Sequence, residues 1–416
     1  MSGSTVVNSG SAAANKIFNA ALFVESTRRN SMTNMLTGTA PKSVSKDKVD
    51  PRKQTSPGAP IVRITDLSKQ AGDEVTMDLF HQLTGRPTMG DRKLAGRVES
   101  LTQSQFTLKI NQGRHVVSSG GRMTQQRTAH NLKQTAKAMI GPWWARLDDQ
   151  LTLVHMAGAR GTDNKADWVV PLESDEEFSE ICVNTLLPPT YDRHVFGGDA
   201  TSFETIDSAD KFSLAEVDKL RLKLDEMAFP LQPVQFEGDP MAEDNPFYVL
   251  LVTPRQWHDF STSTNQYTGG DALRKLQANA SQRMSIFKHP IFLGDCAMWN
   301  GILIKKMSRN ITFASGTTVT VCTNSANAAT TQVTAGTKIG RALCLGAQAL
   351  ATGFGRAGKD EEGGGFFKLH SEPTDHGNEW EHSIWWMNGK KKVRFKGTDG
   401  RINDHGVIAL DTAESA

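Results

Sequence analysis

The stretch Gly85-Arg-Pro-Thr-Met-Gly-Asp-Arg92 separates two segments in which apolar and polar residues alternate. The apolar positions are Val75, Met77 and Leu79 before it and Phe106, Leu108 and Ile110 after it. Alternation with a period of two predicts half-buried strands, and a polar stretch rich in Gly and Pro predicts the turn between them. We therefore expect a long two-stranded ribbon. Because such a ribbon is marginally stable alone, it needs a partner surface on its own domain or on a neighbouring subunit.

Residues 1–58 precede the ribbon and are rich in Ser, Ala, Asn, Thr, Gly and Pro. Only residues 17–24 are appreciably apolar, enough for one short helix. A segment of this composition cannot bury enough apolar surface to fold by itself. It is therefore either disordered or an arm that becomes ordered against another surface.

Helical spacing follows the ribbon. Residues 124–140 place four apolar side chains on one helix face: Leu132, Ala136, Met139 and Ile140. Gly141-Pro142 is expected to end this helix, because proline cannot continue the hydrogen-bond ladder. A second helix should begin at Trp143, and we interpret its apolar stripe as core. We expect most tryptophans to pack in the core and one or two to lie between subunits.

The rest of the chain alternates helical and strand patterns, which indicates a mixed α+β fold. The predicted elements are a helix with a capping box at Ser213 and Glu216, a strand at 248–252, a helix begun by Thr253-Pro254, a helix at 272–284, a hairpin at Asn300-Gly301, strands and loops at 312–337, a helix at 341–351 and a hairpin at Asn388-Gly389. Asn-Gly favours hairpins because both residues tolerate positive φ.

The composition describes a protein with a real core. The chain has 416 residues, a net charge of +2, 38% hydrophobic residues and 22% charged residues. This length suits two or three packed units, at roughly 100–200 residues each. No apolar run approaches the ~18 residues that span a bilayer, and no basic segment followed by an apolar one predicts a signal peptide.

The cationic and cysteine residues give little support to DNA or metal binding. The densest basic clusters are residues 42–53, which we expect to be a solvated loop, and Lys390-Lys391-Lys392, which we expect just after a hairpin turn. Neither resembles the dense basic face that grips phosphates. The cysteines Cys182, Cys296, Cys322 and Cys344 stand singly, which favours buried thiols over a zinc site.

Three patterns imitate functional sites. Gly353-Phe-Gly355-Arg-Ala-Gly358 fits G-x-G-x-x-G, but a predicted helix precedes it where a dinucleotide site needs a strand. His376 and His382 lie six residues apart, which fits no common metal spacing. His155 has no nucleophile or paired carboxylate beside it, so we interpret it as structural. We expect no catalytic residue, no cofactor and no metal.

Several short motifs, taken together and in their order along the chain, resemble those of the major capsid proteins of tailed bacteriophages with the Hong Kong 97-type fold. They are Ser56-Pro-Gly-Ala-Pro-Ile-Val-Arg-Ile-Thr-Asp-Leu, Gly85-Arg-Pro-Thr-Met-Gly-Asp-Arg, Gly121-Arg-Met-Thr-Gln-Gln-Arg-Thr, His155-Met-Ala-Gly-Ala-Arg-Gly, Trp168-Val-Val-Pro, Pro254-Arg-Gln-Trp, His289-Pro-Ile-Phe-Leu-Gly, Met298-Trp-Asn-Gly-Ile-Leu-Ile-Lys-Lys and Leu345-Gly-Ala-Gln-Ala-Leu. The resemblance covers nearly the whole chain. It is nearest to the version in short-tailed phages of the schitovirus group.

The resemblance implies a division of the chain into the parts of that fold. These are an N-terminal arm at 1–58, a peripheral domain with a long spine helix at 59–67 and 113–167, an E-loop at 68–112, an axial domain at 168–374, and a return to the peripheral domain with a C-terminal tail at 375–416. The E-loop of this fold lies across an adjacent subunit. Its tip supplies our candidate inter-subunit contacts: Arg86, Asp91, Arg92 and Arg97.

The resemblance also implies a function without catalysis. Copies of the chain would assemble as pentamers and hexamers into an icosahedral shell around double-stranded DNA, which they would touch only weakly. Further implied partners are scaffolding and portal proteins and a decoration protein, with assembly in the host cytoplasm, no membrane partner, and the virion as final location. The alternatives are an enzyme using the Gly-rich or His-rich loop and a nucleic-acid-binding protein using the basic arm.

Overall fold

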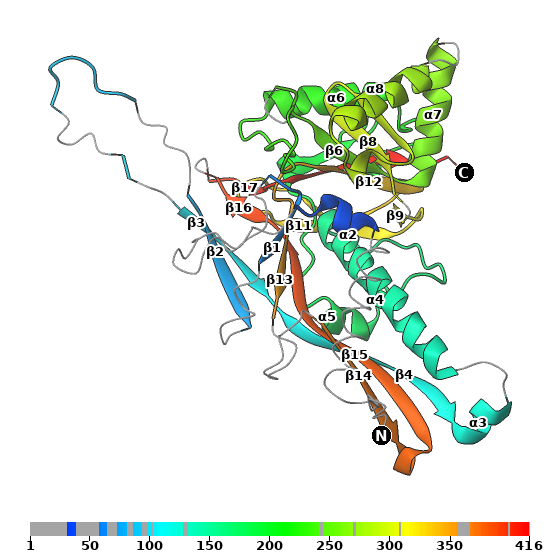
Figure 1. Ribbon diagram of the computed structural model, residues 1–416. Coiled ribbons are helices and arrows are strands. Elements are labelled where there is room, and N and C mark those ends of the chain that lie inside the picture. Colours follow the sequence, from blue (N-terminus) through cyan, green and yellow to red (C-terminus); the bar gives the residue numbers. More distant parts are fainter. Residues whose placement is uncertain are drawn as a thin grey trace.

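The computed structural model describes residues 31–38, 58–64, 73–80, 86–93, 99–100, 103–127, 132–241, 244–268, 272–307, 309–355, 367–397 and 400–415. A globular part with helices on a sheet joins an elongated part made of long strands and one long helix (Figure 1). Most of the predicted arm at 1–58 lies outside the described residues. Within it, helix α2 (Ser31–Leu36) packs against the long helix and was not predicted.

A seven-stranded mixed sheet forms the centre of the globular part. Its strands are β5 (His194–Phe196), β18 (Val407–Ala413), β12 (Ile339–Leu345), β6 (Tyr248–Val252), β8 (Ile302–Lys306) and β7 (Cys296–Trp299) in spatial order, with β9 (Ile311–Phe313) also paired to β12. Three helices share a buried apolar cluster with its strands: α6 (Leu214–Glu226), α7 (Pro254–Thr268) and α8 (Ala272–Ile286). A second, larger cluster includes side chains of β6, β8, β12 and the long helix.

Several local predictions for this part are confirmed. The predicted strand at 248–252 is β6, and Thr253-Pro254 begins α7. Thr253 and Gln256 exchange hydrogen bonds, with the Gln256 N–H donating to Thr253 Oγ1 at 3.2 Å and the Thr253 N–H donating to Gln256 Oε1 at 2.9 Å. Asn300 and Gly301 form the predicted turn between β7 and β8, with φ of 46° and 74°.

The predicted capping box at the start of α6 is wrong. Ser213 does occupy the N-cap position, but its side chain makes no capping hydrogen bond. Glu216 is buried, accepts a hydrogen bond from the Gly198 backbone, and lies 3.8 Å from Lys219. The glutamate therefore joins α6 to the preceding loop instead of closing the helix end.

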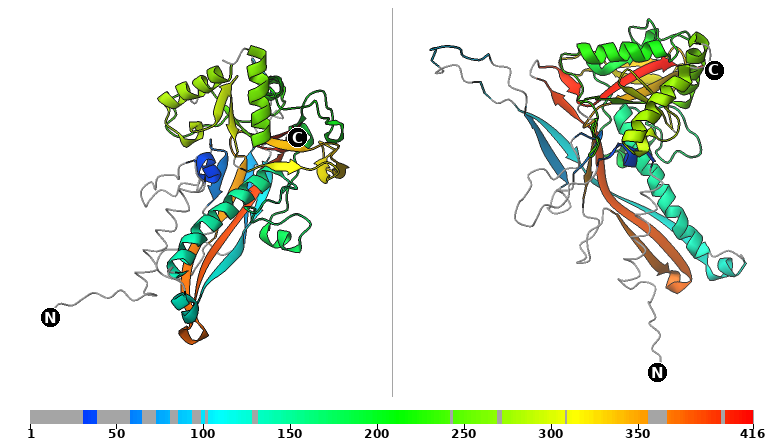
Figure 2. Two further views of the ribbon diagram at one scale, coloured as in Figure 1. Left: turned by 90° about the vertical axis from the view of Figure 1, so that its right-hand side faces the viewer. Right: turned by 45° about the horizontal axis from the view of Figure 1, so that its top comes forward.

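The elongated part contains a five-stranded sheet built on one very long strand. The strands are β1 (Ile61–Ile64), β13 (Leu350–Phe354), β15 (Glu379–Lys392), β14 (Phe367–Thr374) and β4 (Asn111–Gly121). β15 pairs with β4, β13 and β14. Helix α4 (Leu132–Ala157) runs along this sheet (Figure 2). The globular and elongated parts meet where α4 ends among the buried side chains of the globular core.

The predicted helix end at Gly141-Pro142 is wrong. The 124–140 segment begins as the short helix α3 (Arg122–Arg127), and α4 then continues through Pro142 to Ala157. A proline inside a helix removes one backbone donor and costs about 3 kcal/mol. Ile140 and Trp144 flank it, and both are buried in one cluster with side chains of β14 and β15. This packing offsets the cost of the proline and keeps the segment helical on both sides of it.

The predicted helix at 341–351 is also wrong, because this segment is divided between β12 and β13. Every residue of both strands is buried. A strand buried on both faces has no alternation of apolar and polar residues, so its pattern cannot be distinguished from that of a buried helix.

The predicted hairpin at Asn388-Gly389 is wrong as well. β15 continues through both residues. Both pair with β13, and Asn388 also pairs with β4. A side chain at Gly389 would lie 1.9 Å from the Lys109 carbonyl oxygen, so glycine is required by close approach and not by a turn. The true hairpin turn joins β14 to β15, where His376 and Gly377 have φ of 53° and 87°.

The segment 375–416, expected to return to the peripheral domain and to end in a C-terminal tail, contributes strands to both sheets. β15 belongs to the elongated sheet, whereas β18 is an interior strand of the globular sheet between β5 and β12. The remaining elements are α5 (Glu176–Ile181), β10 (Thr318–Cys322), β11 (Thr330–Thr334), β16 (Arg394–Lys396), β17 (Ile402–Asp404), η2 (Tyr191–Arg193), η3 (Phe203–Thr205), η4 (Pro290–Phe292) and η5 (Asp375–Gly377). Across the described residues, no helix has the length and apolar character to cross a membrane.

The close approach at Gly389 generates a stability prediction. We expect Gly389→Ala to lower the free energy of unfolding by about 2 kcal/mol or more, because the new methyl group collides with the Lys109 backbone. Gly336→Ala is the matched control, since its nearest atom would lie at an ordinary 3.6 Å. The measurement is urea unfolding of the soluble subunit. Equal midpoints for the two variants would contradict the close approach of Gly389 to the Lys109 backbone.

Candidate assembly surfaces

The predicted ribbon is confirmed. β2 (Glu74–Phe80) and β3 (Gln103–Lys109) pair antiparallel in continuous register, with Glu74 opposite Lys109 and Phe80 opposite Gln103. The base of the ribbon belongs to the subunit's own core, because Phe106 and Leu108 are buried in one cluster with residues of β1 and β13. The ribbon therefore finds its first partner surface within the subunit.

The tip of the ribbon makes no such contacts. Residues 86–93 project away from the remainder of the chain (Figure 1), and Arg86, Asp91 and Arg92 are exposed. Met89 is 73% exposed, and Gly90 turns the backbone with φ of 69°. None of the ion pairs found among the described residues involves this tip. Arg97 lies outside the described residues, and the contact role of all four charged side chains stays a prediction.

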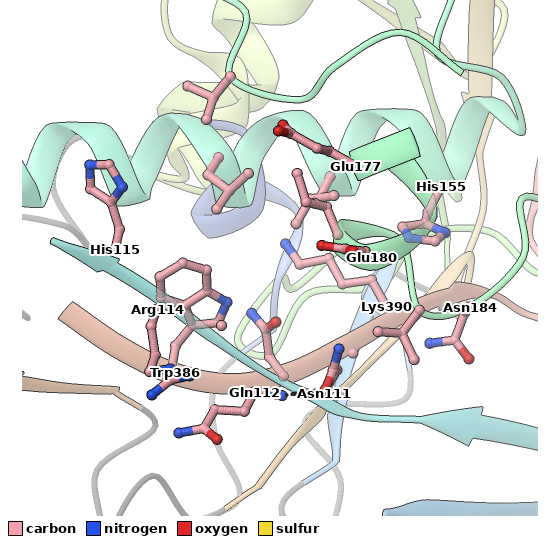
Figure 3. A pocket seen from close by; sticks show the side chains of 18 of the residues that line it. Asn111, Gln112, Arg114, His115, His155, Glu177, Glu180, Asn184, Trp386 and Lys390 are labelled. Atoms are coloured by element: carbon pink, nitrogen blue, oxygen red, sulfur yellow. Dashed lines mark hydrogen bonds between the residues drawn. The ribbon is translucent and has the colours of Figure 1, made fainter. Parts of the chain in front are cut away.

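A hollow of about 670 Å³ opens between α4, α5 and the strands β4 and β15 (Figure 3). We name it the α5 hollow. Its apolar lining includes Trp143, Leu147, Leu151, Ile181 and Trp386. The indole of Trp386 lies over Gly113 of β4, where any side chain would come within 2.2 Å of the ring. Trp143 stacks on His115 with ring centroids 3.8 Å apart.

Charged side chains border the α5 hollow. Glu177 and Glu180 of α5 are exposed and direct their carboxylates over it, while Arg114 of β4 lies on the opposite side (Figure 3). No ion pair between described residues includes either glutamate. This hollow was not predicted from the sequence, although the sequence contains the acidic run Glu173-Ser-Asp-Glu-Glu-Phe-Ser-Glu180 and the paired tryptophans.

The expectation that Lys390-Lys391-Lys392 follows a turn is wrong, because all three lie in β15. Lys390 is buried, with Nζ 2.6 Å from Asp148 Oδ1 of α4. Lys392 is buried 2.8 Å from Asp404 of β17, and burial lowers the pKa of Lys392 to about 8. Lys391 donates to the Thr107 carbonyl of β3 at 2.7 Å. These lysines hold the fold together and are not free to meet DNA.

A second buried ionic group crosses the globular sheet. Arg341 of β12 donates to both carboxylate oxygens of Asp411 of β18, at 2.8 and 2.7 Å. His194 of β5 lies 2.7 Å from the same carboxylate. Burial alone would raise the pKa of Asp411, but Arg341 and His194 outweigh it and hold that pKa below its usual value. The charge is therefore fully compensated, and the group sets the register of three strands.

The described residues of the Gly-rich and His-rich patterns lie in strands, directly after a strand, or in a hairpin turn of the fold. Gly353 lies inside β13 with Leu108 of the ribbon against it, so a strand and not the expected helix precedes the glycine loop, whose remaining part at 356–358 is outside the described residues. His376 is in a hairpin turn, while His382 is buried with Nδ1 2.8 Å from Ser371 Oγ. Among the described residues, no group of three His, Cys, Asp or Glu side chains could hold a metal ion. The four cysteines are buried and unpaired, as predicted.

Comparison with known proteins supports a structural role. A family model described as "Phage capsid protein" matches residues 6–416. The chain belongs to the phage capsid protein family. This membership confirms the predicted class of function, a structural protein of a bacteriophage capsid and hence part of the virion, and it indicates a role that is not enzymatic.

Individual relatives agree with the family. The chain is 30% identical over 105 residues to the major capsid protein of Pseudomonas phage KPP25, an alignment that covers 25% of this chain and only 28% of that protein. The capsid of Ralstonia phage GP4 is similar over 90% of this chain and 96% of that chain, with 27% identity and a TM-score of 0.69. The capsid of cyanophage Pam1 shares the fold at 16% identity, with a TM-score of 0.59 over 87% and 90% of the two chains. The mixed phage capsid fold is thereby established.

The buried histidine of α4 generates a prediction for acid stability. His155 is fully buried near Lys390, and burial lowers the pKa of His155 to about 3. The unfolded chain binds this proton near pH 6.5, so unfolding takes up a proton and stability falls as the pH drops from about 6.5 towards 3. We expect His155→Gln to flatten this fall by up to about 1.4 kcal/mol per pH unit.

The test compares slopes and not absolute stabilities, because the substitution also changes packing. Urea unfolding of the soluble subunit at a series of pH values gives the slope for each variant. His258→Gln is the control, since that side chain is 68% exposed. Identical slopes for the wild type and His155→Gln would show that the pKa of His155 is the same in the native and unfolded states, which contradicts the lowered pKa.

Proposed function

We propose that this chain is the major shell protein of a tailed bacteriophage, with the Hong Kong 97-type fold in the version found in the schitovirus group. Copies assemble as pentamers and hexamers into an icosahedral shell that encloses double-stranded DNA. The observation that carries the proposal is the ribbon, which is anchored at its base by Phe106 and Leu108 and exposed over most of its described tip. A ribbon with a buried base and an exposed tip is suited to contact another molecule.

The proposed parts correspond to the two bodies of the fold. The arm occupies 1–58, the peripheral domain 59–67 and 113–167 with α4 as spine helix, the E-loop 68–112 and the axial domain 168–374. For the axial domain and for the segment 375–416 we propose changes of boundary. β13 and β14 leave the axial domain for the peripheral domain, because both pair with β15 in the five-stranded sheet. β15 stays with the peripheral sheet, and β18 joins the axial domain because it pairs with β12 and β5.

The proposed partners follow from this role. Scaffolding and portal proteins, and a decoration protein, would meet the shell during assembly in the host cytoplasm. DNA would be held weakly, since the net charge of the chain is only +2 and the lysines at 390 and 392 are buried in ion pairs. A shell wall that held phosphates tightly would need exposed cations on its inner face.

Electron microscopy of the purified full chain tests the proposal. Shells, tubes or capsomer rings are the expected result, and their subunits should bury more than about 2,000 Å² with neighbours, as permanent assemblies do. Small monodisperse particles at every protein and salt concentration would overturn it.

The tip generates a prediction that separates folding from assembly. We expect replacement of Arg86, Asp91 and Arg92 together by Ala to leave the thermal midpoint within about 2 °C, because exposed charges contribute only about 0–1 kcal/mol each. The same variant should give fewer particles, with lower resistance to salt, because interfaces use such charges for register and partner choice.

Circular-dichroism melting beside sedimentation of assembled shells checks both halves of this prediction. Normal assembly across a range of salt would mean that the tip is a free loop. Unfolding of the subunit would mean that the tip belongs to its own core.

A further inference from the structure

We infer that the ribbon tip of a second copy of this chain docks into the α5 hollow, with Met89 on the apolar lining and the tip arginines against Glu177 and Glu180. The inference rests on the proposed function. It names the two surfaces that would meet in one contact between subunits of the shell. Each surface exposes apolar side chains, and the two surfaces carry charges of opposite sign.

The α5 hollow needs an occupant of mixed character. Leu147 and Leu151 form the buried floor, and the half-exposed rings of Trp143 and Trp386 stand beside them. Water over such a floor is unfavourable, and aromatic side chains of this kind are common anchors at protein interfaces. The open side is polar, so an apolar side chain flanked by charges fits better than an entirely apolar segment.

The tip presents such a side chain. Met89 is the most exposed of the large hydrophobic residues in the described chain, at 73%. The left-handed turn at Gly90 follows it directly, so the methionine stands at the outermost bend of the ribbon. Methionine is unbranched and polarisable, which lets it fill irregular hollows and contact aromatic ring edges. Trp143 and Trp386 offer such edges.

The charges of the two surfaces are opposite in sign. The described tip carries Arg86, Arg92 and Lys93 against Asp91, a net charge of +2 from three cations and one anion. The rim of the hollow carries Glu177 and Glu180 against Arg114, a net charge of −1. The single anion of the tip and the single cation of the rim are also complementary, because Asp91 would meet Arg114 of β4. Complementary charges of this kind steer association and fix register.

The occupant has to come from another copy. Within one chain the tip points away from α5, from which the body of the molecule separates it (Figures 1 and 2). The base of the ribbon is fixed by side chains buried against β1 and β13. A contact between two different surfaces of identical chains is head-to-tail, and repetition of it closes a ring or extends a lattice.

Charge reversal tests the pairing. Arg86→Glu with Arg92→Glu reverses the tip, and Glu177→Lys with Glu180→Lys reverses the hollow. We expect each double variant to lower the particle yield at physiological salt by about tenfold or more, and the four changes together to restore it to within about threefold, because only coupled sites show such rescue. Glu176→Lys is the matched control, since it lies on α5 but does not line the hollow. Circular-dichroism melting establishes that each variant is folded.

Cross-linking provides a second measurement that does not depend on yield. In particles of the variant Met89→Cys with Glu180→Cys, mild oxidation should produce a ladder of covalent oligomers, which neither single variant forms. The four native cysteines are buried and do not compete. Absence of both rescue and ladder, in wild-type particles that still assemble, overturns the docking and leaves the proposed function standing. If the wild-type chain forms no particles, the proposed function itself is wrong.

Discussion

Three consecutive lysines of β15 hold together parts of the molecule that are distant in sequence. Lys390 pairs with Asp148 of the spine helix α4, Lys391 binds the backbone of the ribbon strand β3, and Lys392 pairs with Asp404 of β17. Removing one partner of a buried pair leaves an uncompensated charge and costs about 3–5 kcal/mol. The position of the ribbon, the axis of α4 and the junction with the globular part therefore all depend on this one run of β15.

Glycine complements these lysines at the same junction. Gly389 lets the backbone of β15 pass against Lys109, and Gly353 lets Leu108 of the ribbon lie against β13. The ribbon is consequently rigid where it leaves the body and exposed at its described tip. This division suits an element that has to reach another molecule in a fixed direction and then adapt to its surface.

The sequence predicts those elements whose conformation depends on the local pattern of residues. It fails for elements whose conformation depends on contacts with residues remote in the chain. Asn300-Gly301 and Asn388-Gly389 are the same dipeptide, yet the first is a turn and the second is strand, because β13 and β4 bind the backbone of β15 at Asn388. Pro142 likewise stays helical through contacts with β14 and β15 that are remote in sequence. The charged ribbon tip was recognised from composition. The α5 hollow was not, since Trp143 and Trp386 come together only through the pairing of β4 with β15 and the packing of α4 on both.

The interior position of β18 has a consequence for synthesis of the protein. β12 pairs with β18 over its whole length, so a growing chain exposes that edge of β12 until residues 407–413 have left the ribosome. An unpaired strand edge recruits other strands, and pairing across such a separation is slow. The globular sheet is thus completed after the ribbon and α4 have been made. A chain that stops before residue 407, as a nonsense or frameshift product does, is left with this edge of β12 unpaired.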